Sequence, residues 1–135
     1  MATFNLKVVT PSRELLNEEV ERVIVRTTSG DVGILKGHTN YIAPLAIGAL
    51  KVVTADQKSQ VAAIAGGMVK VDETGTTILT TTCEWADEID VERAKRAGER
   101  AKKYLENPTE THTVEVANLK LKRALNRINI VNSIL

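Results

Sequence analysis

The stretch WADEIDVERAKRAGERAKKYLENP, residues 85–108, marks the point at which the hydrophobic period of the chain changes. Before it apolar residues recur at every second position, whereas within it they recur every three or four. The second pattern is typical of an amphipathic helix, and Asn107-Pro108 ends it because a helix rarely continues through the residue before proline. Acidic residues stand where a helix dipole favours them: Asp87, Glu88 and Asp90. We therefore expect a β domain over residues 1–86 and a helical domain over residues 87–135.

A second helical pattern follows the proline. Thr113 is a suitable N-cap, and apolar residues then recur along one side: Val114, Ala117, Leu121, Ala124, Leu125 and Ile128. The stripe of the first helix is mostly alanine: Val91, Ala94, Ala97, Ala101 and Leu105. The short connection predicts an antiparallel hairpin. Because alanine buries little area at roughly 25 cal/mol per Å², we expect a marginal hairpin whose shape a ligand can decide.

The part of the chain before Trp85 has the period of a sheet. Apolar and polar residues alternate, or β-branched residues cluster, in four short runs: Phe4 to Val8, Val23 to Val25, Leu50 to Val52 and Thr76 to Thr82. Turn-forming residues separate the runs: Thr10-Pro11-Ser12, Ser29-Gly30-Asp31, Asp56 to Ser59 and Glu73-Thr74-Gly75. These signals predict an N-terminal antiparallel β-sandwich, or flattened barrel, followed by the two-helix hairpin.

The charge balance limits the classes of partner. With 18 Lys+Arg against 17 Asp+Glu, the formal net charge of +1 provides no global field for nucleic acid or an anionic membrane. Residues 1–87 carry a net charge of −2 and residues 88–135 a net charge of +3, so an anionic partner should meet the helical half. A nucleic-acid-binding module using Lys120-Leu121-Lys122-Arg123 is a remote alternative, because aromatic stacking residues are scarce.

Cys83 is the only cysteine, so no intrachain disulfide is possible and a reducing, cytoplasmic setting is expected. We expect no direct membrane insertion, because the apolar run from Tyr41 to Leu50 is too short to span a bilayer.

No nucleophile–base pair, metal-ligand spacing or phosphate loop is present, and we expect His38 to be structural or exposed. Gly66-Gly67 indicates a bulge or a close backbone approach. The chain is expected to be neither an enzyme nor a metal protein.

Arginines form a basic stripe on the two expected helices. Three lie at i, i+3 and i+7 on the first helix and two lie one turn apart on the second: Arg93, Arg96, Arg100, Arg123 and Arg127. In a folded hairpin they can converge on one polyphosphate, where each charge-assisted hydrogen bond contributes roughly 1.5 to 3 kcal/mol. Spacing alone leaves a second reading open, a solvated face with pairs such as Glu92 with Arg96.

Four segments in order resemble bacterial ATP synthase epsilon subunits. Ile89 to Ala94 matches the pattern Ile/Leu-Asp-x-x-Arg-Ala of the ATP-binding members. The others are strand-turn signatures: Val8 to Pro11, Ser29 to Leu35 with Gly37-His38, and Gly66 to Val71. Lys36 and Asn40 stand where members commonly have proline, which leaves that turn less rigid.

The resemblance implies a non-catalytic central-stalk subunit on the cytoplasmic face of the bacterial membrane. Its β domain would couple the gamma subunit to the c-ring, with Asp31 and His38 in the c-ring-facing loop. Its helices would inhibit ATP hydrolysis when extended toward the alpha and beta subunits. An alternative is the same stalk subunit without functional ATP sensing, with inhibition set by gamma and beta contacts only.

The resemblance also implies that ATP is a regulatory ligand that favours the folded, non-inhibitory hairpin. The ATP-binding residues that carry over are Glu84, Ile89, Asp90, Arg93, Ala94, Arg100, Arg123 and Arg127. Arg96 would be an additional phosphate contact that the family pattern does not require. Neither the spacing nor the resemblance assigns a Mg²⁺ ion.

Overall fold

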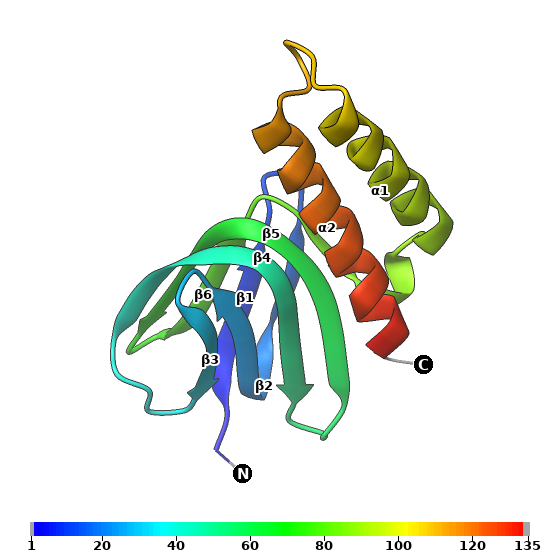
Figure 1. The fold of residues 1–135 in the computed structure, drawn as a ribbon. Coiled ribbons are helices and arrows are strands. Elements are labelled where there is room, and N and C mark those ends of the chain that lie inside the picture. Colours follow the sequence, from blue (N-terminus) through cyan, green and yellow to red (C-terminus); the bar gives the residue numbers. More distant parts are fainter. Residues whose placement is uncertain (1, 134–135) are drawn as a thin grey trace. The chain divides into compact units, whose positions relative to one another are not determined.

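The computed structural model describes residues 2–133, which form two compact units that divide between Trp85 and Ala86 (Figure 1). Within these residues the first unit has seven strands: β1 (Phe4–Val9), β2 (Glu14–Thr27), β3 (Gly30–Leu35), β4 (Tyr41–Thr54), β5 (Ser59–Asp72), β6 (Gly75–Thr80) and β7 (Cys83–Trp85). The second unit has a 3₁₀ turn and two helices: η1 (Ala86–Glu88), α1 (Val91–Glu106) and α2 (Val114–Ser133). The predicted fold class is confirmed.

The strands of the first unit form one sheet that closes on itself. Its order is β1-β6-β5-β4-β2-β3, β1 also pairs with β2, and β7 pairs with β5. The pairings are antiparallel except for β1 with β6, which is parallel. That parallel pairing is a departure from the all-antiparallel arrangement expected from the sequence. It brings the first strand beside the sixth, and short-range periodicity does not reveal such a pairing.

Branched aliphatic side chains fill the interior of the sandwich. Leu6, Val8, Val23, Val25, Leu50 and Val52 are fully buried, as their alternation predicts. The predicted close approach at Gly66-Gly67 is confirmed, because a Cβ on Gly67 would lie 1.9 Å from the Leu79 carbonyl oxygen. Gly67 also has a φ of +123°, which disfavours any other residue. Cys83 is buried and Trp85 packs against the same core, as expected.

Local capping sets the ends of the helices. The Asp90 carboxylate oxygen Oδ1 accepts the Arg93 N–H at 3.0 Å, so Asp90 is the N-cap of α1. At the other end the Asn107 N–H donates to the Lys103 carbonyl, also at 3.0 Å. The predicted cap of the second helix is confirmed, since Thr113 Oγ1 accepts the Val116 N–H at 3.3 Å. Asp87 and Glu88 lie in η1 rather than in the helix itself.

The two helices run antiparallel (Figure 1), and small side chains lie between them. We call the small buried residues the helix seam: Ala94, Gly98, Ala101, Ala117 and Ala124; Ile130 of α2 is also buried. A Cβ on Gly98 would lie 3.6 Å from the Ala124 Cβ, so the helices are close there. The expected stripe of α2 was partly wrong: Val114 and Leu125 are 46% and 45% exposed, because the narrow seam covers few positions. Neither described helix has the length and apolar character needed to cross a membrane.

Candidate functional site

The start of α1 joins the motif residues Asp90, Arg93 and Ala94. One oxygen of Asp90 caps the helix, while its side chain remains on the surface. The Arg93 side chain is exposed, Ala94 is buried in the helix seam, and Ile89 is half-buried. The structure therefore brings Asp90 and Arg93 together at a helix N-terminus, where backbone N–H groups and the helix dipole favour an anion.

Helix geometry places arginines from both helices on one side of the hairpin. At about 100° per residue, Arg93 and Arg100 stand roughly 100 to 120° from Ala94. Arg123 and Arg127 stand roughly 60 to 100° from Ala124, in the same rotational sense. Because the helices are antiparallel, these two sides coincide. We call the four residues the arginine face: Arg93, Arg100, Arg123 and Arg127.

The contacts between the helices also show that these arginines lie at similar positions along the hairpin axis. Gly98 lies opposite Leu121 and Ala124, so Arg93 stands near the level of Arg127. The positions on α1 span seven residues, about 10 Å at 1.5 Å per residue. Long side chains from both helices can therefore reach one polyphosphate. Arg96 lies about 160° from Ala94, which turns it away from α2.

The two flanks of the hairpin differ in how their charges are paired. On the flank opposite the arginine face, Lys95 lies 3.7 Å from Glu92 and Lys102 lies 3.6 Å from Glu99. Glu92 thus pairs with Lys95 rather than with Arg96, the example pair named for a solvated face, while the solvated face itself stays an alternative. Among residues 2–133, no carboxylate lies within ion-pair distance of the exposed arginines of the face: Arg93, Arg100 and Arg123. That unneutralised charge suits an anion.

Glu84, the remaining residue assigned to the nucleotide, lies in β7 of the first unit. It pairs with Ala63 of β5 and its side chain is half-buried. Its part in binding stays a prediction. Among the described residues, no group of three or more His, Cys, Asp or Glu side chains could hold a metal ion.

Asp31, assigned to the c-ring-facing loop, is held by an arginine that the sequence analysis missed. Arg26 Nε lies 2.5 Å from Asp31 Oδ1, and Arg26 Nη2 lies 3.3 Å from Oδ2. These hydrogen bonds, aided by the positive charge of Arg26, lower the pKa of Asp31. Arg26 and Asp31 are direct partners in the β2–β3 ladder. The short turn between them was the sequence feature from which this pairing could have been predicted. The aliphatic part of the Arg26 side chain passes over Gly48. A Cβ on Gly48 would lie 2.5 Å from the Arg26 Cβ.

The loop that lacks the two prolines is held by other contacts. The His38 N–H donates to the Leu35 carbonyl at 3.2 Å, and Gly37 adopts a φ of +82°. His38 Nδ1 lies 2.7 Å from the Thr39 carbonyl, and its ring meets the Tyr41 ring edge-on at 5.8 Å. A glycine turn and an aromatic contact therefore order a segment in which proline would otherwise restrict the backbone.

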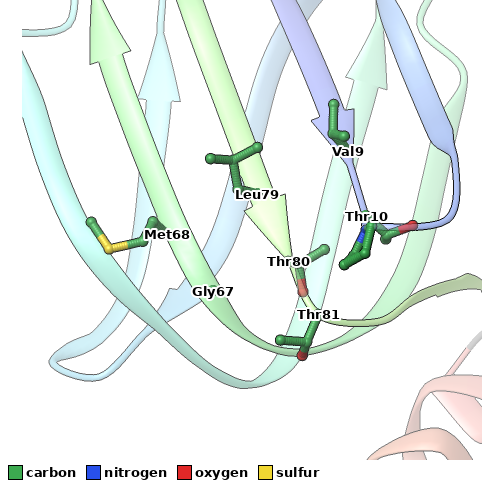
Figure 2. A pocket seen from close by; sticks show the side chains of 8 residues that line it. Val9, Thr10, Gly67, Met68, Leu79, Thr80 and Thr81 are labelled. Carbon is green, nitrogen blue, oxygen red and sulfur yellow. The ribbon is translucent and has the colours of Figure 1, made fainter.

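An exposed apolar row crosses four strands of the sandwich, and the sequence analysis did not identify it. Its members are direct partners in the sheet and so share one face: Val9, Leu79, Met68 and Pro44. Leu79 is 53% exposed and Met68 43% exposed. Beside them is an open apolar pocket of about 370 Å³ that also includes Pro11 and Gly67 (Figure 2). We call the four residues the apolar row. Apolar residues gathered on one exposed face are typical of a protein-binding site.

Comparisons with known proteins cover both units. The beta-sandwich domain model of the ATP synthase delta/epsilon chain matches residues 3–86, and the long alpha-helix domain model of the same chain matches residues 87–132. The ATP synthase epsilon chain of Ruminococcus albus is 44% identical over 133 residues, 98% of either chain. That of Alkaliphilus metalliredigens is 43% identical over 130 residues, 96% of either chain.

Two solved structures have the same fold. A chain in the Euglena gracilis mitochondrial ATP synthase, OSCP/F1/c-ring, superposes with a TM-score of 0.83 at 28% identity, covering 93% of this chain and 79% of that one. A chain in the central stalk and c-ring of the Tetrahymena thermophila mitochondrial ATP synthase has a TM-score of 0.67 at 17% identity, covering 95% and 96%. The second likeness concerns the fold alone.

Proposed function

This chain belongs to the ATP synthase delta/epsilon chain family, as an epsilon chain of the central stalk, and we propose that it couples the gamma subunit to the c-ring and senses ATP. It is a non-catalytic subunit. In this proposal residues 1–86 bind the gamma subunit and the c-ring, and residues 87–135 regulate ATP hydrolysis. The complex would place the chain on the cytoplasmic face of the membrane.

The apolar row is the surface that we assign to gamma. It offers exposed aliphatic and thioether side chains on a rigid sheet, a suitable platform for a partner that must turn with it. Met68→Glu with Leu79→Glu should abolish co-purification with gamma while the sheet stays folded. Lys58→Glu, on the exposed turn between β4 and β5, is the matched control for adding a carboxylate. Undiminished binding of the double variant would assign gamma to another face.

The arginine face carries the ATP-sensing part of the proposal. Within residues 2–133 its exposed guanidinium groups, those of Arg93, Arg100 and Arg123, have no carboxylate partners, and they share one side only while the helices are packed. ATP would therefore bind the closed hairpin and stabilise it. At a hundredfold excess over its dissociation constant, a ligand adds about 2.7 kcal/mol to the state that it binds. That amount can decide the state of a hairpin with so small a seam.

When ATP falls, the helices would open and extend along gamma toward the alpha and beta subunits. Their lysine and arginine side chains would then meet acidic groups there and block rotation in the direction of hydrolysis. The bound nucleotide acts as a signal. No residue of the arginine face is a nucleophile or a general base that could cleave it.

Isothermal titration calorimetry on the whole chain tests the sensing role. We expect saturable ATP binding that is weakened by salt, because the contacts are ionic. The absence of binding heat, with no change in melting temperature, would leave a stalk subunit whose inhibition depends on gamma and beta contacts alone.

A further inference from the structure

Two stacked rings close the end of the hairpin at which the chain reverses. Tyr104 lies in the last turn of α1, and His112 lies just before α2. Their ring centroids are 3.7 Å apart and their planes differ by 8°. Both side chains are half-buried, whereas residues 106–111 between them are exposed. They are the only aromatic rings in the sequence of residues 86–135, so the contact has no counterpart along the helix seam.

The loop bonds to itself in a way that fixes the position of the His112 ring. The Thr109 N–H donates to the His112 carbonyl at 3.0 Å, and the His112 N–H donates to Thr109 Oγ1 at 3.0 Å. The Thr111 hydroxyl lies 3.2 Å from His112 Nδ1. Pro108 prevents α1 from continuing into this segment. The turn thus holds the imidazole over the phenol ring by contacts of its own.

We propose that Tyr104 and His112 are positioning residues that close the hairpin and thereby hold the arginine face in its binding geometry. This inference rests on the proposed binding of ATP to that face. Tyr104 lies on the same side of α1 as Arg100 but one turn beyond it toward the loop, so the ring pair stands at the loop end of the arginine face and is not one of its guanidinium groups. Their effect is indirect. For a ligand that binds only the closed hairpin, the apparent dissociation constant equals the intrinsic one divided by the fraction of molecules that are closed.

The small residues of the helix seam explain why this one contact matters. Five of the six buried residues of the two described helices are alanine or glycine, which bury little area, and the sixth is Ile130, so the closed state has little stabilisation to spare. An aromatic pair contributes beyond the area that it buries, enough to change an equilibrium by about two- to tenfold. Closing the loop end also lowers the entropy that is lost when the arginines gather around one anion.

Calorimetry with ATP on ring-removing and ring-keeping variants of the full chain tests the proposal. Tyr104→Ala and His112→Ala should each raise the dissociation constant about two- to tenfold. Tyr104→Phe and His112→Phe keep two flat rings and should restore the affinity. Lys103→Ala, one position from Tyr104 on the exposed side, is the control for general damage to the last turn. Failure of the Phe variants to rescue would mean that the rings act through something other than stacking, and the proposal would be overturned.

A distance measurement without ATP separates this proposal from the sensing role. Spin labels at Lys95→Cys and Lys122→Cys, in a Cys83→Ala background, report the separation of α1 and α2 by pulsed electron paramagnetic resonance. Both label sites are exposed and lie outside the arginine face. Tyr104→Ala should lower the population at the short distance, and Tyr104→Phe should not.

The combined outcomes distinguish the two failures. If wild-type chain binds ATP but the alanine variants keep both its affinity and the short distance, the positioning role is wrong and the sensor stands. If wild-type chain does not bind ATP, the sensing proposal is wrong. In that case, loss of the short distance in Tyr104→Ala with rescue by Tyr104→Phe supports the role of the ring pair in closing the hairpin, and an unchanged distance overturns that role as well.

Discussion

The core of the sandwich is built from branched aliphatic side chains such as Leu50, Val52 and Ile78, whereas the helices meet through Ala94, Gly98 and Ala124. Burial of one Val, Leu or Ile contributes roughly 1.5 to 3 kcal/mol, and alanine contributes much less. The sheet also closes on itself through β1, while the hairpin has one seam and one loop. The contrast suits the two proposed roles, a rigid platform that binds other subunits and an element whose state a small ligand changes.

The largest expected effect tests the rigid side of this comparison. Leu50→Ala removes a fully buried side chain from the middle of the sheet and should lower the free energy of unfolding by about 2 to 5 kcal/mol. Urea denaturation followed by far-UV circular dichroism measures it. A loss well below 1 kcal/mol would mean that the sandwich is loosely packed and that the contrast with the hairpin is false.

Removal of one arginine from the arginine face tests the other half of the comparison, the helical hairpin whose state a ligand is proposed to change. Arg93→Ala should raise the dissociation constant for ATP about 10- to 150-fold, because it removes charge-assisted hydrogen bonds. Arg96→Ala is the matched control, since that side chain turns away from α2 and its loss should change binding less than threefold. Equal losses from the two variants, measured by calorimetry, would show that net charge rather than the arginine face binds the nucleotide.

Asp90 has two roles that paired substitutions can separate. Asp90→Ala removes the N-cap and should destabilise α1 by about 0.5 to 2 kcal/mol. Asp90→Asn keeps a good cap but loses the carboxylate. Native-state hydrogen exchange of α1 should therefore change in Asp90→Ala only. ATP affinity should fall in both variants if the carboxylate contacts the ligand, and an unaffected affinity in Asp90→Asn would limit Asp90 to capping.

Substitution of Gly98 by alanine should change the stability of the hairpin by a smaller amount, and in the stabilising direction. A Cβ there meets Ala124 and Leu121 at ordinary contact distances, and alanine favours a helix over glycine by about 0.5 to 1 kcal/mol. Gly98→Ala should therefore stabilise the hairpin and slow the hydrogen exchange of α1. Gly98→Leu, which is too large for the gap, should separate the helices and weaken ATP binding. Destabilisation by the alanine variant would show that the helix seam has no room for a methyl group at Gly98.

The smallest effect concerns the Arg26–Asp31 pair on the sheet. Because Arg26 lowers the pKa of the folded-state Asp31 carboxyl, the pair adds stability above the ordinary Asp range. That contribution is lost as the pH falls below about 4, where the carboxyl takes up a proton. Both side chains are about half exposed, so the change should be slight and reduced by salt. Melting curves of wild type and Asp31→Asn between pH 3 and 7 should converge at the acid end.

Local patterns in the sequence predicted the elements well because the contacts that define them are local. The alternation through Leu6 and Val8 and the cap at Thr113 both reflect neighbours within a few residues, and the structure confirms them. The parallel pairing of β1 with β6 was not predictable in this way. It joins residues such as Val8 and Ile78, whose proximity depends on the closure of the whole sheet.

The candidate site was predictable as a set of residues and less so as an arrangement. Spacing placed the arginines on two helices, but it could not show that Lys95 pairs with Glu92. The exposure of Leu125 was missed because apolar character alone does not reveal the width of the helix seam. The Tyr104–His112 stack depends on the path of a seven-residue loop around Pro108, which periodicity does not describe.

Hydrogen exchange of the whole chain, with and without ATP, tests the central claim most directly. If ATP binds and stabilises the closed hairpin, amide exchange in residues 91–133 should slow, by up to about a hundredfold at a hundredfold excess of ligand over its dissociation constant. Residues 4–80, which hold none of the residues assigned to ATP, should exchange at unchanged rates and so provide an internal control. Equal exchange of the helices with and without saturating ATP would contradict the account.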